Sequence, residues 1–216
     1  MAIIEIVRSD EPGALDRAAD ALRRGEVICI PTETVYGLAA LPRADSVERL
    51  ITAKQRSTEK GIQLLVDSVA QAAGLCVLST AAARLARSFW PGGLTLVLDR
   101  RPDSDLPLLL GGGRATLGLR LPDHELPRDL ARILGPVAAS SANVTGLPPA
   151  TTAEMVIESL SDVVSLIVDD GPVRGGVSST VVDCSGSAAE APVVLREGAI
   201  PTSAIFAALG QEYTSD

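Results

Sequence analysis

The chain has 216 residues, of which 46% are hydrophobic and 21% charged, and its formal net charge is −8. This length suits one large domain or two small ones, and the composition is that of a globular protein with a sizeable core. Only five residues are aromatic, and the charge balance is acidic. Both facts argue against a broad surface that binds nucleic acid nonspecifically.

The three cysteines and the single histidine exclude several kinds of site. Cys29, Cys76 and Cys184 are odd in number, far apart and set in apolar runs, so we expect buried thiols in a reducing compartment. A zinc site is not expected, because there is one histidine and no CxxC motif. That residue, His124, stands in the polar turn PDHELP, where we expect a solvated histidine.

The sequence offers no signal peptide and no membrane span. The N-terminal stretch MAIIEIVRSDEPG lacks a basic region, and Glu5 interrupts its short apolar run. No segment approaches the roughly 20 apolar residues that cross a bilayer. We therefore expect a cytoplasmic protein with no membrane association.

Strand and helix patterns alternate along the chain. In order, we expect a strand at 3–7, a helix within 11–26, a strand at 27–30, a helix at 45–56, a strand at 62–66, a helix at 79–90, strands at 94–98 and 115–121, a helix at 125–134, a strand at 137–141, a helix at 151–160, strands at 164–168, 179–184 and 192–196, and a helix at 202–210. Thr151 and Glu154 have capping-box spacing.

This interleaving predicts a single α/β domain over residues 1–208, with a frayed tail at 209–216. The last three strands are too close in sequence for helical crossovers. We therefore expect a mixed sheet that is partly antiparallel.

The segment KQRSTEKG is the first candidate for chemistry. Lys54, Arg56 and Lys60 fall within seven positions of an acidic protein. If the helix ends near Ala53 and the chain becomes extended, Lys54 and Arg56 point the same way and form a clamp for a polyphosphate. A solvated helix end, with cations favoured by the helix dipole, explains the same pattern equally well.

Two further segments follow or form strands. In TLGLRLP, Thr116, Gly118 and Arg120 share one strand face, and the planar guanidinium suits a carboxylate or phosphate unless the strand is an exposed edge. In SSANVTG, Ser141 and Asn143 come directly after a strand, where α/β sheets bind ligands. An ordinary turn is the alternative explanation for this segment.

Three weaker segments complete the set. PTETVYGLAA places Thr34 and Tyr36 behind a buried strand, GGVSSTVVDCSG contains Ser179, and LREG contains Arg196. There is no P-loop, and GGG at 111–113 does not open a helix as a dinucleotide fingerprint must. We expect that triplet to be a flap or turn.

Taken in order, PTETVYGLAA, KQRSTEKG, FWPGGLTLVL, TLGLRLP, SSANVTG, STVVDCSG and LREGAI resemble the YrdC/Sua5 family of threonylcarbamoyl-AMP synthases. The likeness runs from about residue 8 to residue 208 and is closest to the short, single-domain YrdC type. It implies a single α/β domain whose twisted mixed sheet and helices surround a concave basic cleft.

The resemblance also implies a reaction. L-threonine, bicarbonate and ATP, accompanied by Mg²⁺, form threonylcarbamoyl-adenylate and pyrophosphate, and a downstream transferase moves the threonylcarbamoyl group to adenosine 37 of tRNAs. The matching positions imply three roles: catalysis by Lys54 and Arg56; threonine binding by Thr34, Arg120 and Ser179; and ATP binding by Arg56, Lys60, Thr116, Ser141, Asn143 and Arg196. The resemblance implies no tightly bound, protein-ligated metal. Tyr36 is expected to wall the same cleft, and Glu33 has no assigned role.

Two alternatives remain at this point. The same basic cleft suits an RNA-binding or ribosome-maturation module with weak affinity for tRNA or double-stranded RNA. Hydrogenase-maturation proteins contain a similar domain that transfers carbamoyl groups, but nothing in this sequence resembles their zinc-finger or acylphosphatase parts.

Overall fold

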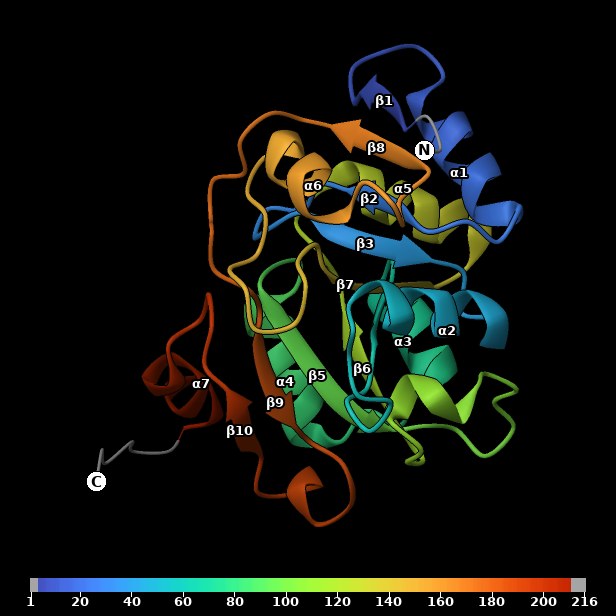
Figure 1. The fold of residues 1–216 in the computed structure, drawn as a ribbon. Helices are drawn as coiled ribbons and strands as arrows, with labels where there is room; N and C mark the ends of the chain where they lie inside the picture. Colours follow the sequence, from blue (N-terminus) through green and yellow to red (C-terminus); the bar gives the residue numbers. More distant parts are fainter. Residues whose placement is uncertain (1–3, 211–216) are drawn as a thin grey trace.

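The computed structural model describes residues 4–210 as one α/β domain built on a ten-stranded mixed sheet. The strand order is β1-β8-β2-β3-β7-β4-β6-β5-β9-β10, and Figure 1 shows β1 and β10 at opposite ends of the molecule. The expected fold class is therefore confirmed. Most of the tail expected at 209–216 lies outside the described residues. Leu209 itself is the last residue of the final helix.

The strands are short and agree closely with the expected segments. Their bounds are β1 Glu5–Arg8, β2 Ile28–Ile30, β3 Gly37–Ala40, β4 Gln63–Leu65, β5 Leu94–Asp99, β6 Thr116–Arg120, β7 Val137–Ser141, β8 Leu166–Asp169, β9 Thr180–Asp183 and β10 Val193–Arg196. The sequence analysis missed β3, because its four residues are too short to show a period.

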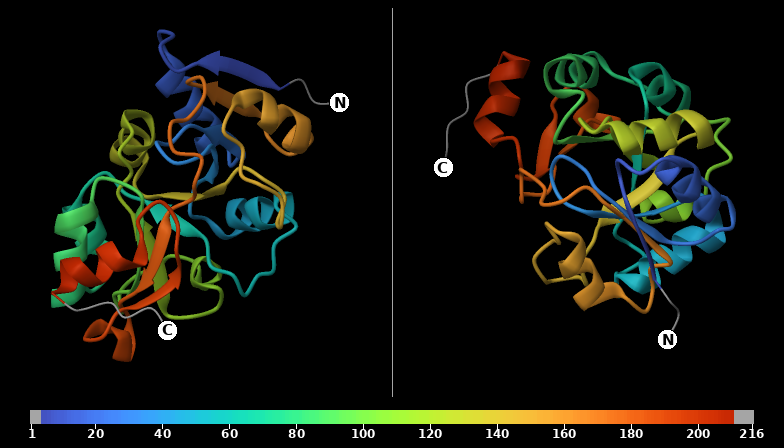
Figure 2. Two further views of the ribbon diagram at one scale, coloured as in Figure 1. Left: turned by 90° about the vertical axis from the view of Figure 1, so that its left-hand side faces the viewer. Right: turned by 90° about the horizontal axis from the view of Figure 1, so that it is seen from above.

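The helices cover the sheet in separate groups, as the two further views in Figure 2 show. Helices α1 and α5 contact each other, α2 contacts β3, and α4 contacts β5 and α7. Their bounds are α1 Ala14–Arg23, α2 Ala44–Ala53, α3 Val69–Leu75, α4 Thr80–Phe89, α5 Glu125–Leu134, α6 Ala153–Leu160 and α7 Thr202–Leu209. No described helix is long and apolar enough to cross a bilayer.

Two helix ends correct the sequence analysis. Helix α3 was missed, although Ser68 caps it by accepting a hydrogen bond from the Gln71 amide. Helix α6 begins one residue later than the capping box predicts. Thr152, not Thr151, accepts the hydrogen bond from the Met155 amide, so the expected box is wrong by one position.

The last three expected strands do not lie side by side. Strand β8 pairs with β1 and β2 in parallel, whereas β9 pairs with β5 in parallel and with β10 antiparallel. The loop between β8 and β9 crosses the sheet and lies on the segment after β2. Its Gly176 amide donates to the Thr34 carbonyl oxygen at 2.8 Å.

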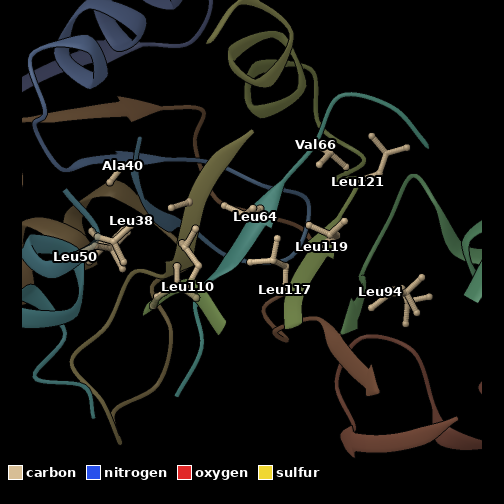
Figure 3. Close-up of a cluster of buried hydrophobic side chains, with 14 of the residues drawn as sticks. Leu38, Ala40, Leu50, Leu64, Val66, Leu94, Leu110, Leu117, Leu119 and Leu121 are labelled. Carbon is tan, nitrogen blue, oxygen red and sulfur yellow. The ribbon is translucent and has the colours of Figure 1, made fainter. Parts of the chain in front are cut away.

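The core is aliphatic, as the small number of aromatic residues requires. Figure 3 shows leucines from β3, β4, β5 and β6 converging in one cluster, and Leu64, Leu117 and Leu119 are fully buried there. All three cysteines are buried and free, as expected. Because β6 alternates, Thr116, Gly118 and Arg120 face away from this cluster.

Candidate active site

A cavity of about 630 Å³ opens on the polar face of β4, β5, β6 and β9. Five of its lining residues are cationic and two are acidic, in a chain with a net charge of −8. The cations are Arg56, Lys60, Arg114, Arg120 and Arg196, and the acids are Glu59 and Asp183. An inward-facing set of cations of this kind raises the local concentration of small anions.

Seven of the ten predicted site residues line this cavity. They are Arg56, Lys60, Thr116, Arg120, Ser141, Ser179 and Arg196. They come from segments spread over most of the chain, which the sheet order brings together. Their individual roles stay predictions.

The remaining three predicted residues lie directly behind the lining. Thr34 is 3% exposed, and its hydroxyl accepts a hydrogen bond from Arg120 Nη2 at 2.9 Å. Lys54 is 2% exposed and donates from Nζ to the carbonyl oxygens of Ser141 and Asn143. Asn143 accepts through Oδ1 from Lys54 and from the Ser141 hydroxyl. Thr34, Lys54 and Asn143 therefore support residues that face the cavity.

The chain around Lys54 corrects the expected clamp. Helix α2 ends at Ala53, but Lys54 keeps helical dihedrals and Gln55 has a φ of 49°. A left-handed residue reverses the chain, so Lys54 and Arg56 do not lie on one extended strand face. Arg56 instead folds over its own loop and donates to the Gly61 carbonyl oxygen at 2.9 Å.

The glycine triplet at 111–113 forms a packed turn that supports the Arg56 loop. A Cβ on Gly112 would lie 2.2 Å from the Glu59 carbonyl oxygen, and one on Gly111 would lie 2.3 Å from that of Thr116. Both contacts are too short for any side chain. The turn alternative is therefore confirmed, and its glycines permit the Glu59–Lys60 segment to approach β6.

Burial and repulsion between neighbouring cations lower the pKa values of Lys54, Arg56 and Arg196. Burial, with a smaller contribution from the nearby Arg56, lowers the pKa of Lys54 to about 8. Burial also lowers the pKa of Arg56, with a contribution from Arg196, and the pKa of Arg196, with a contribution from Arg120. Without a ligand, these positive charges repel one another.

Tyr36, which follows β2, and His124, which follows β6, differ from expectation. Tyr36 does not line the cavity, because its hydroxyl donates to the Gly171 carbonyl oxygen at 2.8 Å and accepts from the Asp170 amide at 3.0 Å. His124 is not a solvated turn residue. Its side chain is 16% exposed, and Nε2 lies 3.2 Å from the Asp170 carboxylate. Both residues hold the start of the β8–β9 loop.

Sequence reasoning missed several residues that line the cavity. Gln63, Thr95, Arg114, Asp183 and Ser185 all lie there. Thr95 and Asp183 alternate with buried leucines and valines on their strands, so their spacing was the available signal. Arg114 stands alone after the glycine triplet and gave none.

A cavity lined by five cations on the polar face of a mixed α/β sheet has the features of a binding site for small polyanions. The family model for Sua5/YciO/YrdC, described as telomere recombination, matches residues 20–198. This chain belongs to that family.

Curated relatives and solved structures agree with this assignment. A protein of Bacillus subtilis (strain 168) named threonylcarbamoyl-AMP synthase is 40% identical over 197 residues, which are 90% of this chain and 56% of that protein. A protein of the same name from Idiomarina loihiensis is 38% identical over 170 residues, covering 76% of this chain and 88% of the relative. The chain therefore spans little more than half of one relative and most of the other.

Two solved structures share the fold. The structure of Pyrococcus abyssi Sua5 complexed with L-threonine has a TM-score of 0.88 and 35% identity, covering 98% of this chain and 62% of that one. E. coli YciO has a TM-score of 0.82 and 25% identity, covering 95% of this chain and all of that one.

Proposed function

We propose that this protein is an L-threonylcarbamoyladenylate synthase. It would join L-threonine, bicarbonate and ATP and release pyrophosphate. The observation that carries the proposal is the cavity of about 630 Å³ lined by five cations. A triphosphate, a bicarbonate and an amino-acid carboxylate are all anions, and one basic cavity would bring them together despite the acidic chain.

The residues divide by their position around the cavity. Arg56, Lys60 and Arg196 are the proposed phosphate contacts, because their cationic groups are gathered without enough acids to neutralise them. Arg120 is the proposed anchor for the threonine carboxylate. Ser141, held by Lys54 and Asn143, is the proposed contact for the nucleotide.

The reaction needs little acid–base apparatus, which suits a site without histidine. The neutral amine of threonine attacks the carbon of CO2 or bicarbonate and forms a carbamate, with release of a proton in the first case and of water in the second. A carbamate oxygen then attacks the α-phosphorus of ATP, the bond to the bridging oxygen breaks, and pyrophosphate leaves. The protein would contribute by positioning the anions and stabilising the charge that develops on the leaving group.

Mg²⁺ fits this site only together with ATP. Asp183 and Glu59 are the carboxylates of the described lining, and no group of three potential metal ligands occurs among the described residues. Mg²⁺ is commonly held by one or two carboxylates plus substrate phosphates. Bound in that way, it would offset negative charge on the triphosphate, with Asp183 or Glu59 as its protein ligand.

The product would pass to a tRNA threonylcarbamoyltransferase, and we accordingly expect the reaction in the cytoplasm. The RNA-binding alternative is less well supported, because the chain as a whole is acidic and contains only five aromatic residues. A weak affinity for tRNA stays a prediction.

Identification of the product tests the proposal. The protein is incubated with ATP, Mg²⁺, L-threonine and isotopically labelled bicarbonate, and the mixture is analysed by mass spectrometry. We expect an AMP adduct that contains both threonine and the labelled carbon. A mixture that contains only ATP and its hydrolysis products would rule the activity out.

A further inference from the structure

A chain of hydrogen bonds crosses the floor of the cavity and involves two residues with no assigned role. Thr95 Oγ1 lies 2.7 Å from Gln63 Oε1 and 2.8 Å from Ser179 Oγ. Thr95 and Ser179 are each 3% exposed, and all three residues line the cavity. A buried polar network of this kind is fixed in geometry, because an unmade hydrogen bond there is costly.

The sheet places these residues together because Gly118 lies between two of them. Strand β6 separates β4 from β5, and its Gly118 has no side chain. A Cβ at that position would lie 3.5 Å from Thr95 Cγ2 and 3.7 Å from Gln63 Cβ. The side chains of Gln63 and Thr95 therefore meet across the strand that separates them.

The direction of each hydrogen bond follows from the number of protons available. A carboxamide oxygen only accepts, so Thr95 donates its single hydroxyl proton to Gln63 Oε1. Thr95 then has only lone pairs for Ser179, and Ser179 must donate to Thr95. The Ser179 oxygen is left with acceptor capacity toward the cavity. The Gln63 amide nitrogen keeps two N–H donors, because its oxygen is the atom that the network uses.

Arg196 holds the Ser179 end of this network in place. Its Nη2 donates to the Ser179 carbonyl oxygen at 2.7 Å and lies 3.5 Å from the hydroxyl oxygen. The strong bond fixes the backbone, and the long one leaves the hydroxyl oxygen open to a ligand. The floor thus presents a donor, from Gln63, and an acceptor, from Ser179.

We propose that Gln63 and Ser179 recognise the side-chain hydroxyl of the amino-acid substrate, and that Thr95 is the positioning residue that sets their polarity. A hydroxyl accepts and donates at once, so it satisfies both groups. Arg120, two residues from Gly118 on the same strand face, is the proposed anchor for the carboxylate of that substrate. The inference rests on the proposed function for the identity of the amino acid.

Discrimination between L-threonine and L-valine is the expected consequence. Valine has the same shape without the hydroxyl, and a site built to hydrogen-bond a hydroxyl rejects an analogue that lacks it. Binding of either amino acid would leave Gln63 and Ser179 in the same place, but valine would leave both without a partner.

The test compares three variants with the wild type. Thr95→Val keeps the shape and removes the hydroxyl, Thr95→Ser keeps the hydroxyl, and Gln63→Met removes the amide donors without adding a charge. Binding of L-threonine and of L-valine is measured by titration calorimetry, and the KM values for L-threonine and ATP are measured by pyrophosphate release. We expect Thr95→Val and Gln63→Met to weaken L-threonine binding about tenfold, with L-valine binding and the KM for ATP within twofold of wild type. For Thr95→Ser, the affinities for both amino acids and the two KM values should stay within threefold of the wild type.

The outcomes separate this inference from the proposed function. If Thr95→Val keeps the wild-type preference for threonine over valine, the inference is overturned. Equal weakening of both amino acids also overturns it, because the network would then serve their shared groups. If Thr95→Val does not fold, Gln63→Met decides by the same criteria. Wild-type protein that binds threonine selectively without releasing pyrophosphate would reject the proposed function and leave the recognition floor intact.

Discussion

The guanidinium of Arg120 lies 2.7 Å from the carboxylate of Glu33 and is almost completely buried beside it. Arg120 Nη2 also donates to the Thr34 hydroxyl at 2.9 Å, and Nε donates to the Gly92 carbonyl oxygen at 3.1 Å. The segment PTET after β2 therefore holds the arginine of β6 from behind. Within the described residues, the Nη1 donors remain for a ligand in the cavity.

Glu33→Ala should weaken threonine use more than ATP use. The change leaves a buried arginine without its charged partner, and hydrogen bonds to charged groups contribute about 1.5–3 kcal/mol. We expect the KM for L-threonine to rise at least tenfold, and the KM for ATP to change less than threefold. Glu33→Gln keeps an oxygen acceptor, so its KM for L-threonine should lie between those of Glu33→Ala and the wild type. Steady-state kinetics on both substrates measure the difference.

Asp20→Ala is the matched control, because Asp20 pairs with Arg23 on the exposed surface of α1. Exposed pairs of this kind contribute little, so its kinetics should match the wild type. An unchanged KM for threonine in Glu33→Ala would show that Arg120 does not need Glu33 to function.

Arg56→Ala and Arg120→Ala should each lower kcat/KM at least a hundredfold while the protein stays folded. Each change removes a cation that lines the cavity, and a site that works by electrostatics depends on every such charge. Circular dichroism checks the fold and pyrophosphate release checks the rate. Arg23→Ala, on the exposed surface of α1, is the control and should be fully active. Near-normal activity in either site variant would remove that residue from the proposed site.

Lys54 should make stability depend on pH above neutrality. Its pKa is lowered from 10.5 to about 8 by burial and by Arg56. Below pH 8 both the native and the unfolded chain hold the proton, whereas between pH 8 and 10.5 the unfolded chain holds it and the native chain has released it. The free energy of unfolding contributed by this group therefore rises with pH in that window.

Denaturant titrations of the wild type and Lys54→Met at several pH values measure this effect. The free energy of unfolding of the wild type minus that of Lys54→Met should be flat below pH 7 and rise by about 1–2 kcal/mol between pH 8 and 9.5. A difference that stays constant across that range would mean that native Lys54 titrates as it does in water.

Pyrophosphate alone should stabilise the wild-type protein. Repulsion from Arg196 contributes to the lowered pKa of Arg56, and repulsion from Arg120 contributes to that of Arg196. A bound polyanion would relieve this repulsion. At a hundredfold excess over its Kd, a ligand adds about 2.7 kcal/mol, which raises Tm by roughly 5–10 °C for a chain of this size. Arg196→Gln should lose most of the shift, while Arg132→Gln on α5 should keep it. Equal shifts in all three proteins would place the polyanion elsewhere.

The sequence allowed the fold class and seven of the residues that line the cavity to be predicted. Strands such as Thr116–Arg120 alternate strictly, so the side of the sheet on which Arg120 lies is fixed by period alone. The same alternation places Leu117 and Leu119 on the opposite side of the sheet, in the aliphatic core. The position of Ser141 at the carboxyl end of a strand then identified it as a neighbour of a site, whereas Ser179, directly before β9, was identified through the family resemblance.

Other features depend on contacts between distant segments and leave no local pattern. Tyr36 meets the loop after β8, and His124 meets Asp170, only because β8 lies beside β2 at the far end of the sheet from β9. The partnership of Glu33 with Arg120 likewise joins residues 87 positions apart. Strand order, which decides all three contacts, cannot be read from spacing along the chain.

Pyrophosphate release under omission of single substrates tests the central claim most directly. The wild-type protein is supplied with ATP and Mg²⁺, and L-threonine and bicarbonate are added together, singly or not at all. The proposed synthase should release pyrophosphate at a substantial rate only when both are present, because the attacking carbamate needs both. Release that continues at the same rate without threonine would contradict the account.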